Sequence, residues 1–229
     1  MRRLAVFDLD GTLTDTNDVD AECFLAALEA SFSIRNASHD WEDYSDVTDV
    51  SILAELVMQE RGRPPSHEEQ TAFIGEFVRR LAAEDRKRFT EIAGARTLLT
   101  HLQAIGWTVV VATGGWRESA LLKLRYGGFG TLELPVATGN DARTRVEIIG
   151  SALMRGGGAL EPTAPIVLFG DAIWDVRAAQ RLGLPLIAVA AGACAAKLGE
   201  LGARVVIENY LDIHRVIGAI DAVMRDHLV

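Results

Sequence analysis

The chain has few of the residues that mark secreted, disulfide-bonded or zinc-binding proteins. Its 229 residues include two cysteines, Cys23 and Cys194, which are far apart and in no CxxC pair. Neither a disulfide framework nor a cysteine-based zinc site is therefore indicated. The five histidines are scattered without ligand spacing. No stretch has the pattern of an export signal and no apolar run is as long as a membrane span, so the sequence predicts a cytoplasmic protein without membrane contact.

Positive charge is also scarce. The 23 Lys and Arg residues against 32 Asp and Glu give a formal net charge of -9, and no Lys/Arg-rich run occurs. Nucleic acid is therefore not an expected partner, although a local cationic pocket could hold a small anion. A small phosphorylated molecule remains a plausible partner. The oligomeric state is not predicted.

The first apolar stretch ends in acidic residues. Residues 4–7 form a continuous apolar run, typical of a buried parallel strand, and Asp8, Asp10 and Gly11 follow. Open α/β sheets bind their ligands beyond the carboxyl ends of their strands. Two carboxylates this close repel each other unless a cation lies between them or one is protonated. The pattern predicts a metal site, a proton-transfer site or both, with an Asx turn as the alternative.

Strands and helices alternate over the second part of the chain. Glycine breaks and stretches of helical periodicity separate apolar runs at residues 107–112, 132–137, 166–169, 186–189 and 204–207. This alternation predicts an α/β fold with a doubly wound parallel sheet.

An insertion is expected between the first strand and these repeating units. Helical patterns without a strand signal cover about residues 18–32, 49–61 and 66–88. We expect residues 16–90 to form a helical lid, and residues 1–15 and 91–229 to form the α/β core.

Further polar motifs should meet at the same edge of the sheet. Thr113-Gly114-Gly115 follows a predicted strand and offers a hydroxyl group and a backbone that can approach an anion. A transferring phosphoryl group also needs a cationic side chain. No lysine occurs between Thr131 and Glu161, so Arg143 and Arg145 are the candidates.

Two more carboxylates follow a later strand. Gly170-Asp171-x-x-x-Asp175 comes after the apolar run at 166–169 and places its acidic residues one helical turn apart. Mg²⁺ prefers hard oxygen ligands and commonly keeps several waters. The motif therefore predicts a magnesium site, with a helix N-cap at Asp171 as the alternative.

In this order the motifs resemble those of the haloacid dehalogenase-like hydrolases, in the helical-cap subgroup that includes phosphoglycolate phosphatases. The resemblance implies a Rossmann-like core, an all-helical cap and a Mg²⁺ cofactor. It implies that Asp8 attacks phosphorus and that Asp10 acts as general acid and then as general base. The metal would be held by Asp8, the Asp10 carbonyl, Asp171 and Asp175.

The same resemblance assigns the phosphate-binding groups. Thr113 and Gly114 would hold the phosphoryl oxygens. Arg145 is similar to the variant with an arginine just before a helix, whereas Arg143 fits the spacing of a commoner lysine variant, and we favour Arg145. The chain departs from the usual pattern at Gly115 and Ala172, where Asn and a hydroxyl residue are common.

These features predict a magnesium-dependent phosphatase that hydrolyses a small phosphorylated metabolite through an aspartyl-phosphate. A phosphomutase of the same family would carry the same motifs, and a response-regulator-like module or a non-catalytic protein that binds a phosphorylated ligand are further alternatives. The lid should recognise the leaving group. Its candidate substrate-binding residues are Thr48 and Asp49, with a helix N-cap as the alternative for Thr48.

Overall fold

The computed structural model describes residues 3–157 and 165–227. Within them, a six-stranded sheet has the order β5-β4-β1-β6-β7-β8, and all its strand pairs are parallel. The strands are β1 (Arg3–Phe7), β4 (Trp107–Ala112), β5 (Val136–Ala137), β6 (Ile166–Gly170), β7 (Leu186–Val189) and β8 (Val205–Ile207). The predicted doubly wound α/β fold is confirmed.

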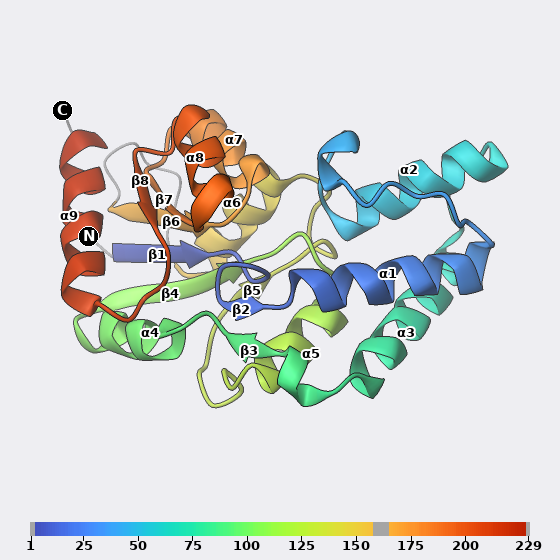
Figure 1. The fold of residues 1–229 in the computed structure, drawn as a ribbon, viewed down its shortest axis with the longest axis horizontal. Helices are drawn as coiled ribbons and strands as arrows, with labels where there is room; N and C mark the ends of the chain where they lie inside the picture. Colours follow the sequence, from blue (N-terminus) through green and yellow to red (C-terminus); the bar gives the residue numbers. More distant parts are fainter. Residues whose placement is uncertain (1–2, 158–164, 228–229) are drawn as a thin grey trace.

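Helices cover both faces of this sheet (Figure 1). They are α4 (Ala95–Ala104), α5 (Arg117–Tyr126), α6 (Arg145–Arg155), α7 (Ile173–Leu182), α8 (Gly192–Glu200) and α9 (Ile213–His227). Successive residues of β1 point to opposite faces: Ala5 and Phe7 pack in the cluster with α4 and α9, whereas Leu4 and Val6 pack with α6 and α7. The central strand is therefore buried on both sides.

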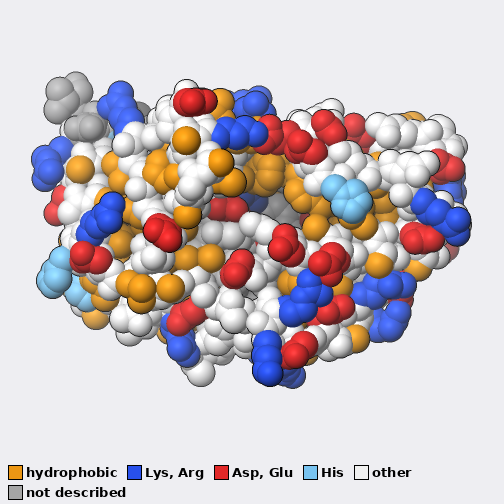
Figure 2. Space-filling model, in the orientation of Figure 1, with side chains coloured by type: hydrophobic (Ala, Val, Ile, Leu, Met, Phe, Trp, Pro, Cys, Tyr) orange, Lys and Arg blue, Asp and Glu red, His pale blue; other side chains and the backbone are white. Residues whose placement is uncertain are grey.

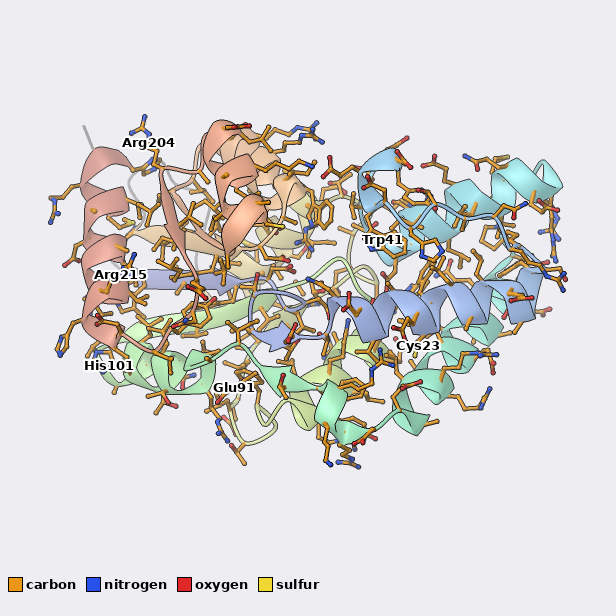
Figure 3. All side chains as sticks on the ribbon, in the orientation of Figure 1. Cys23, Trp41, Glu91, His101, Arg204 and Arg215 are labelled. Atoms are coloured by element: carbon orange, nitrogen blue, oxygen red, sulfur yellow. The ribbon has the colours of Figure 1, made fainter. Side chains whose placement is uncertain are left out.

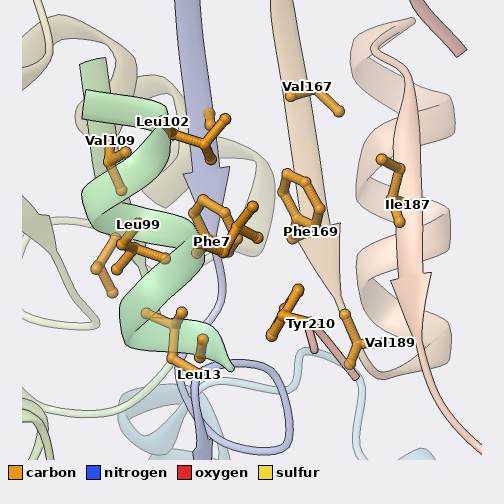
Figure 4. Packing of buried hydrophobic residues seen from close by; sticks show 14 of the residues in the cluster. Phe7, Leu13, Leu99, Leu102, Val109, Val167, Phe169, Ile187, Val189 and Tyr210 are labelled. Carbon is orange, nitrogen blue, oxygen red and sulfur yellow. The ribbon is translucent and has the colours of Figure 1, made fainter. Parts of the chain in front are cut away.

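Aromatic packing fixes the ends of the two strands that precede the acidic motifs (Figure 4). The rings of Phe7 and Phe169 stack with centroids 4.2 Å apart, and Tyr210 meets Phe7 edge-on at 6.3 Å. The Tyr210 hydroxyl donates to the carbonyl of Thr12 at 3.0 Å. This packing holds the loop after β1 beside the end of β6.

The helical insertion lies to one side of the sheet and forms the cap (Figure 1). It consists of α1 (Asn17–Phe32), η1 (Trp41–Asp43), α2 (Asp49–Arg61), α3 (His67–Ala83) and η2 (Arg86–Arg88). The flanking strands β2 (Thr14–Asp15) and β3 (Thr90–Glu91) pair antiparallel, so the chain leaves and re-enters the core side by side. The predicted all-helical cap is confirmed, while its limits of 16 and 90 stay a prediction. None of the described helices is long and apolar enough to cross a membrane.

One core residue packs inside the cap. Trp116, just before α5, is fully buried, stacks on Phe24 with centroids 6.0 Å apart, and meets Phe73 and Phe77 edge-on at 5.4 and 6.1 Å. Leu122 of α5 belongs to the same apolar cluster. The cap and the core therefore share a hydrophobic interface.

The third cap helix is shorter than predicted. The sequence pattern extends it to Arg88, but it ends at Ala83. Glu84 is extended, and the Asp85 side chain accepts a hydrogen bond from the backbone N–H of Lys87, which starts the separate turn η2. This side-chain cap at Asp85 competes with continuation of the helix.

The strand expected at 132–137 is also shorter, because only Val136 and Ala137 pair with β4. The preceding residues form turns, in which the N–H of Leu132 bonds to the carbonyl of Phe129 and the N–H of Leu134 to that of Leu132. Residues 132 and 134 pack on the core from these turns. The apolar pattern therefore identifies core residues correctly, but the extended backbone predicted for them is wrong.

Candidate active site

The loop after β1 is tight and brings its backbone against a later motif. The carbonyl of Leu9 accepts hydrogen bonds from the N–H groups of Leu13 and Thr14 at 2.8 and 2.9 Å. Gly11 has a positive φ of 73°, and a Cβ added there would lie 1.9 Å from Oδ2 of Asp171. Glycine is required at this position on both counts.

Three carboxylates meet at the ends of β1 and β6. Asp8, Asp171 and Asp175 each offer an oxygen, and these oxygens all lie within 4.8 Å of one another. Asp8 is only 8% exposed, and its Oδ1 is buried without a hydrogen-bond partner. Clustered carboxylate oxygens and an orphaned one among them fit a hard divalent cation such as Mg²⁺.

Burial disfavours the ionised forms of two of these carboxylates, Asp8 and Asp171, without a cation. It raises the pKa of Asp8 to about 7; Arg145 lowers the value in part and Asp175 raises it further. The pKa of Asp171 lies well above its usual range, because of burial and then the charge of Asp8. A bound cation would favour the ionised forms of Asp8 and Asp171.

Arg145 reaches this cluster, as the sequence favoured. It is the first residue of α6, whose N-cap Thr144 forms a capping box with Glu147. Its Nη2 lies 3.1 Å from Oδ1 of Asp8, an ion pair without hydrogen-bond alignment, and it donates a hydrogen bond to Asp175. Burial opposes the charge of Arg145, but Asp175 and Asp8 outweigh it and raise the arginine's pKa.

The loop after β4 lies against both Arg145 and the cap. The hydroxyl of Thr113 accepts a hydrogen bond from the N–H of Gly115 at 3.1 Å. A Cβ added at Gly114 would lie 2.9 Å from the carbonyl oxygen of Val47 and 3.2 Å from Nη1 of Arg145. Glycine therefore permits the close approach of a cap segment and a cationic side chain at this loop.

The second aspartate of the first motif is not part of the three-carboxylate cluster, and it bonds to a lysine that was not predicted from the sequence. Oδ1 of Asp10 accepts from the Thr16 hydroxyl at 2.5 Å, and Oδ2 accepts from Nζ of Lys123 at 2.6 Å. Lys123 is fully buried and also donates to Oδ1 of Asp20 at 2.7 Å. Its position among inward-facing residues of α5, between Ala120 and Leu124, is the signal that could have revealed it.

The two cap residues predicted to bind substrate connect the cap to the core. Thr48 is the N-cap of α2, as the alternative had it, and its hydroxyl also donates to the carbonyl of Arg143 at 2.8 Å. The N–H of Asp49 donates to the carbonyl of Gly114 at 3.0 Å, and Oδ2 of Asp49 accepts from the N–H of Trp116 at 3.0 Å. The start of α2 is therefore docked over the predicted phosphate-binding motif.

These groups enclose a cavity of about 80 Å³ between the core and the cap. Acidic side chains border the hollow between these two parts on the face shown in Figure 2. Of the predicted site residues, the cavity is lined by Asp8, Asp10, Thr48, Asp49, Thr113, Gly114, Arg145 and Asp171. Asp175 lies behind them, bonded to Arg145. Arg143 is exposed and does not line the cavity, so the structure does not bring its side chain to the site.

Several polar and aromatic residues of the lining were not predicted from the sequence. Asn17, the first residue of α1, donates to Oδ2 of Asp171 at 3.0 Å. Trp174 of α7 and Trp41 of η1 also line the cavity, and Figure 3 places Trp41 between η1 and α1. Asn17 and Trp174 lie close after the two acidic motifs, and Trp41 lies in the loop of the cap. No pattern in the sequence indicates that these side chains point into the cavity.

Residues 5–189 match the family model described as haloacid dehalogenase-like hydrolase. The chain belongs to this family. No curated protein matches the chain significantly.

Solved structures of similar fold align with nearly the whole length of this chain. A hydrolase from Pseudomonas syringae has 21% identity and a TM-score of 0.73, covering 96% of this chain and 99% of its own. A putative beta-phosphoglucomutase from Bacteroides vulgatus has 22% identity and a TM-score of 0.71, with 97% and 90% covered. A predicted phosphoglycolate phosphatase from Haemophilus somnus 129pt has 17% identity and a TM-score of 0.66, with 94% and 98% covered. At these identities the likeness shows the shared fold.

Proposed function

We propose that this haloacid dehalogenase-like hydrolase is a magnesium-dependent phosphatase that acts on a small phosphorylated metabolite and passes through an aspartyl-phosphate, an acyl phosphate on Asp8. The observation that carries the proposal is the oxygen of Asp8 that is buried, has no hydrogen-bond partner and lines a cavity beside Arg145. A carboxylate in this position is a competent nucleophile toward phosphorus. The location of the protein in the cytoplasm stays a prediction from the sequence.

Asp8, Asp171 and Asp175 would hold the Mg²⁺ ion, and we expect the carbonyl of Asp10 to join them. The ion would supply positive charge that lowers the repulsion between the phosphate and these carboxylates. Arg145 supplies a second positive charge beside Asp8.

In the first step, an oxygen of Asp8 forms a bond to phosphorus and the bond from phosphorus to the substrate oxygen breaks. The leaving oxygen takes a proton from the carboxyl group of Asp10, which lines the same cavity. Arg145 and the loop at Thr113 and Gly114 orient the phosphoryl oxygens, because a cation and an accessible backbone lie together there.

In the second step, Asp10, now a carboxylate, takes a proton from water while the water oxygen attacks phosphorus. The bond between phosphorus and Asp8 breaks, so Asp8 is regenerated and inorganic phosphate leaves. The Thr16 and Lys123 hydrogen bonds hold the Asp10 side chain in one place through both steps.

The first prediction tests the nucleophile. Asp8→Asn keeps the shape of the side chain but removes the carboxylate, so phosphate release from p-nitrophenyl phosphate with Mg²⁺ should fall at least about 10³-fold. The fold should persist, as measured by circular dichroism. Wild-type protein quenched during turnover should carry phosphate on Asp8 by mass spectrometry. Phosphate on a Ser, Thr or His instead, or equal release in the presence of chelator, would contradict the proposal.

A further inference from the structure

We propose that the alcohol part of the substrate carries an amino group and no second anionic group. This inference rests on the proposed function, because it concerns the part of the same cavity that would receive the leaving group. The orphaned oxygen of Asp8 and Arg145 define the phosphate end. The cap side of the cavity, which contributes Asp20, Phe24, Trp41 and Asp49, is the wall that would contact whatever the phosphate is attached to.

That wall offers no positive charge to an anion. Among the described residues that line the cavity, Arg145 is the only Lys or Arg, and Asp8 and Asp175 already pair with it. Arg177 and Arg181 line an adjacent groove, which shares Val47, Arg145 and Trp174 with the cavity, but neither of these two arginines lines the cavity itself. A substrate with a carboxylate or a second phosphate would thus bury that group without a cationic partner, which is strongly unfavourable.

The same wall has an excess of negative charge. Asp10, Asp20 and Asp49 all line the cavity, and Lys123 lies behind them as a single ammonium group that bonds to the first two. Three carboxyl groups therefore share one lysine, and Lys123 forms ion pairs with Asp10 and Asp20. Among the described residues, no Lys or Arg forms an ion pair with Asp49.

Asp49 is the carboxylate best placed to meet a substrate cation. It lies at the cap wall and uses Oδ2 to accept from the N–H of Trp116 at 3.0 Å. Burial, followed by the charge of Asp20, raises the pKa of Asp49 well above its usual range. An ammonium group beside Asp49 would relieve both effects, since it favours the ionised carboxylate.

Aromatic side chains complete a site suited to an amine. Phe24, Trp41 and Trp174 line the cavity together with the acidic residues. The rings of Phe24 and Trp41 meet edge-on with centroids 5.9 Å apart, which leaves a rigid wall on the α1 side. Aromatic faces attract ammonium groups, most strongly those of tryptophan.

The groove that leads to the cavity is also lined by acidic residues. A groove of about 510 Å³ shares Asn17, Trp41 and Trp174 with it, so the two are adjacent. The groove adds Asp18, His39 and Glu22, the last of which pairs with Arg88 at 2.8 Å, and no Lys or Arg is among its described lining residues. Its field would favour an amine-bearing substrate over one with extra negative charge.

The test compares three two-carbon phosphate esters that differ at one end. These are 2-aminoethyl phosphate, 2-hydroxyethyl phosphate and phosphoglycolate, which end in an ammonium, a hydroxyl and a carboxylate. With Mg²⁺, kcat/KM should be at least about tenfold higher for the amine than for the alcohol, because the ammonium forms a charge-assisted hydrogen bond. It should be lower again for the carboxylate, which the acidic wall repels. Equal values for amine and alcohol, or a preference for phosphoglycolate, would overturn the inference.

A binding measurement separates this inference from the proposed function. Calorimetry on Asp8→Asn, which should not turn over, measures the affinity for 2-aminoethyl phosphate and for phosphoglycolate in the presence of Mg²⁺. Tighter binding of the amine is expected whether or not the wild type hydrolyses it. If p-nitrophenyl phosphate is not hydrolysed, the proposed function fails; if it is hydrolysed but phosphoglycolate binds more tightly, only this inference fails.

A pair of variants on α2 assigns the preference to one carboxylate. Asp49→Asn should reduce the ratio of kcat/KM for the amine over the alcohol at least about fivefold, as the removal of one ion pair predicts. The matched control is Glu60→Gln, which removes one negative charge from an exposed position on the same helix and should leave the ratio unchanged. An unchanged ratio in Asp49→Asn would remove Asp49 from the proposal.

Discussion

At the scale of single residues, Lys123 has the least expected position in the molecule. A lysine is almost never fully buried without partners, and this one is enclosed by Asp10 from the core and Asp20 from the cap. Burial disfavours its charge, but the two aspartates outweigh burial and raise its pKa. Lys123 is therefore charged, and it joins the proposed acid and base to the first cap helix.

Replacing this lysine should be costly. Lys123→Met fills a similar volume but leaves Asp10 and Asp20 as neighbouring carboxylates without a counter-charge, so the free energy of unfolding should fall by about 3 kcal/mol. Urea unfolding at pH 7.5 measures this. Lys87→Met, at an exposed position in η2, is the matched control and should change stability by less than about 0.5 kcal/mol. A similar small change in Lys123→Met would mean that the buried cluster contributes nothing net.

Asp20 should make stability depend on pH. Burial raises its pKa to about 6, against the opposing charge of Lys123, whereas an unfolded Asp titrates near about 3.9. Between these values the native state holds a proton that the unfolded state has lost, so this contribution to stability decreases as pH rises from about 4 to 6 and is constant above.

The measurement is the unfolding free energy of metal-free protein between pH 4 and 8. In Asp20→Asn, the decrease in unfolding free energy between pH 4 and 6 should be smaller than in the wild type, by an amount on the order of 2 kcal/mol. Asp18→Asn, exposed on the same helix, should keep the wild-type slope. A steeper curve in Asp20→Asn would show that the sign of the effect is wrong.

Asp171 should be needed for the effect of Mg²⁺ on stability. A ligand that binds only the native state stabilises it in proportion to the logarithm of its concentration over Kd. The melting temperature of the wild type should rise by several degrees at ~10 mM Mg²⁺, about what 1–2 kcal/mol produces, and that of Asp171→Asn should not. Asp221→Asn, exposed on α9, should respond like the wild type. An equal shift in all three proteins would place the ion elsewhere.

At the scale of elements, α5 is the helix that joins the two parts. Its preceding residue, Trp116, is buried among Phe24, Phe73 and Phe77, although the chain reaches it directly from the loop at Thr113. Movement of the cap against the core must therefore disturb either this cluster or the loop. The apolar packing around Trp116 therefore couples the position of the cap, on which access to the cavity depends, to the position of the loop at Thr113.

Removing that side chain should loosen the interface. Trp116→Ala should lower the free energy of unfolding by about 3–5 kcal/mol, as large aromatic truncations in cores do. Hydrogen exchange should increase in α1 and α3 more than in α9, which does not touch the cluster. Trp116→Phe is the milder control, because it keeps a ring and removes the indole N–H that has no partner. Uniform loss of protection along the chain would indicate global destabilisation instead.

Elements with strong local signals could be predicted closely. Residues 107–112 and 49–61 form β4 and α2 within the predicted limits, because an apolar run between glycines and an amphipathic stretch with an N-cap threonine leave little choice. The predictions that a helix extends to Arg88 and that a strand begins at Leu132 were wrong. At both places, short-range hydrogen bonds of a cap or a turn outweighed the apolar pattern. Those bonds depend on backbone geometry that residue types do not determine.

At the scale of the whole molecule, parallel topology made much of the candidate site predictable. Asp8, Thr113 and Asp171 each follow a strand, and parallel strands bring such residues to one edge however far apart they are in the sequence. The neighbours that come from the cap or from a helix face, such as Asp20 and Lys123, obey no such rule. Their places depend on how the cap packs against α5, which no local pattern specifies.

The pairing of β2 with β3 has a consequence for how such proteins can change over time. Thr14 lies opposite Glu91. The cap segment between these two residues is therefore connected along the chain to the core only through two adjacent, paired strands. A segment of different length or shape could replace it without altering the order of the sheet, provided that it offers an apolar seat for Trp116 and an acidic partner for Lys123. If the proposed function holds, the residues that would carry out the reaction and the cap residues that would contact the leaving group lie in separable parts of one gene, so that exchange of the insert could change the specificity and keep the chemistry.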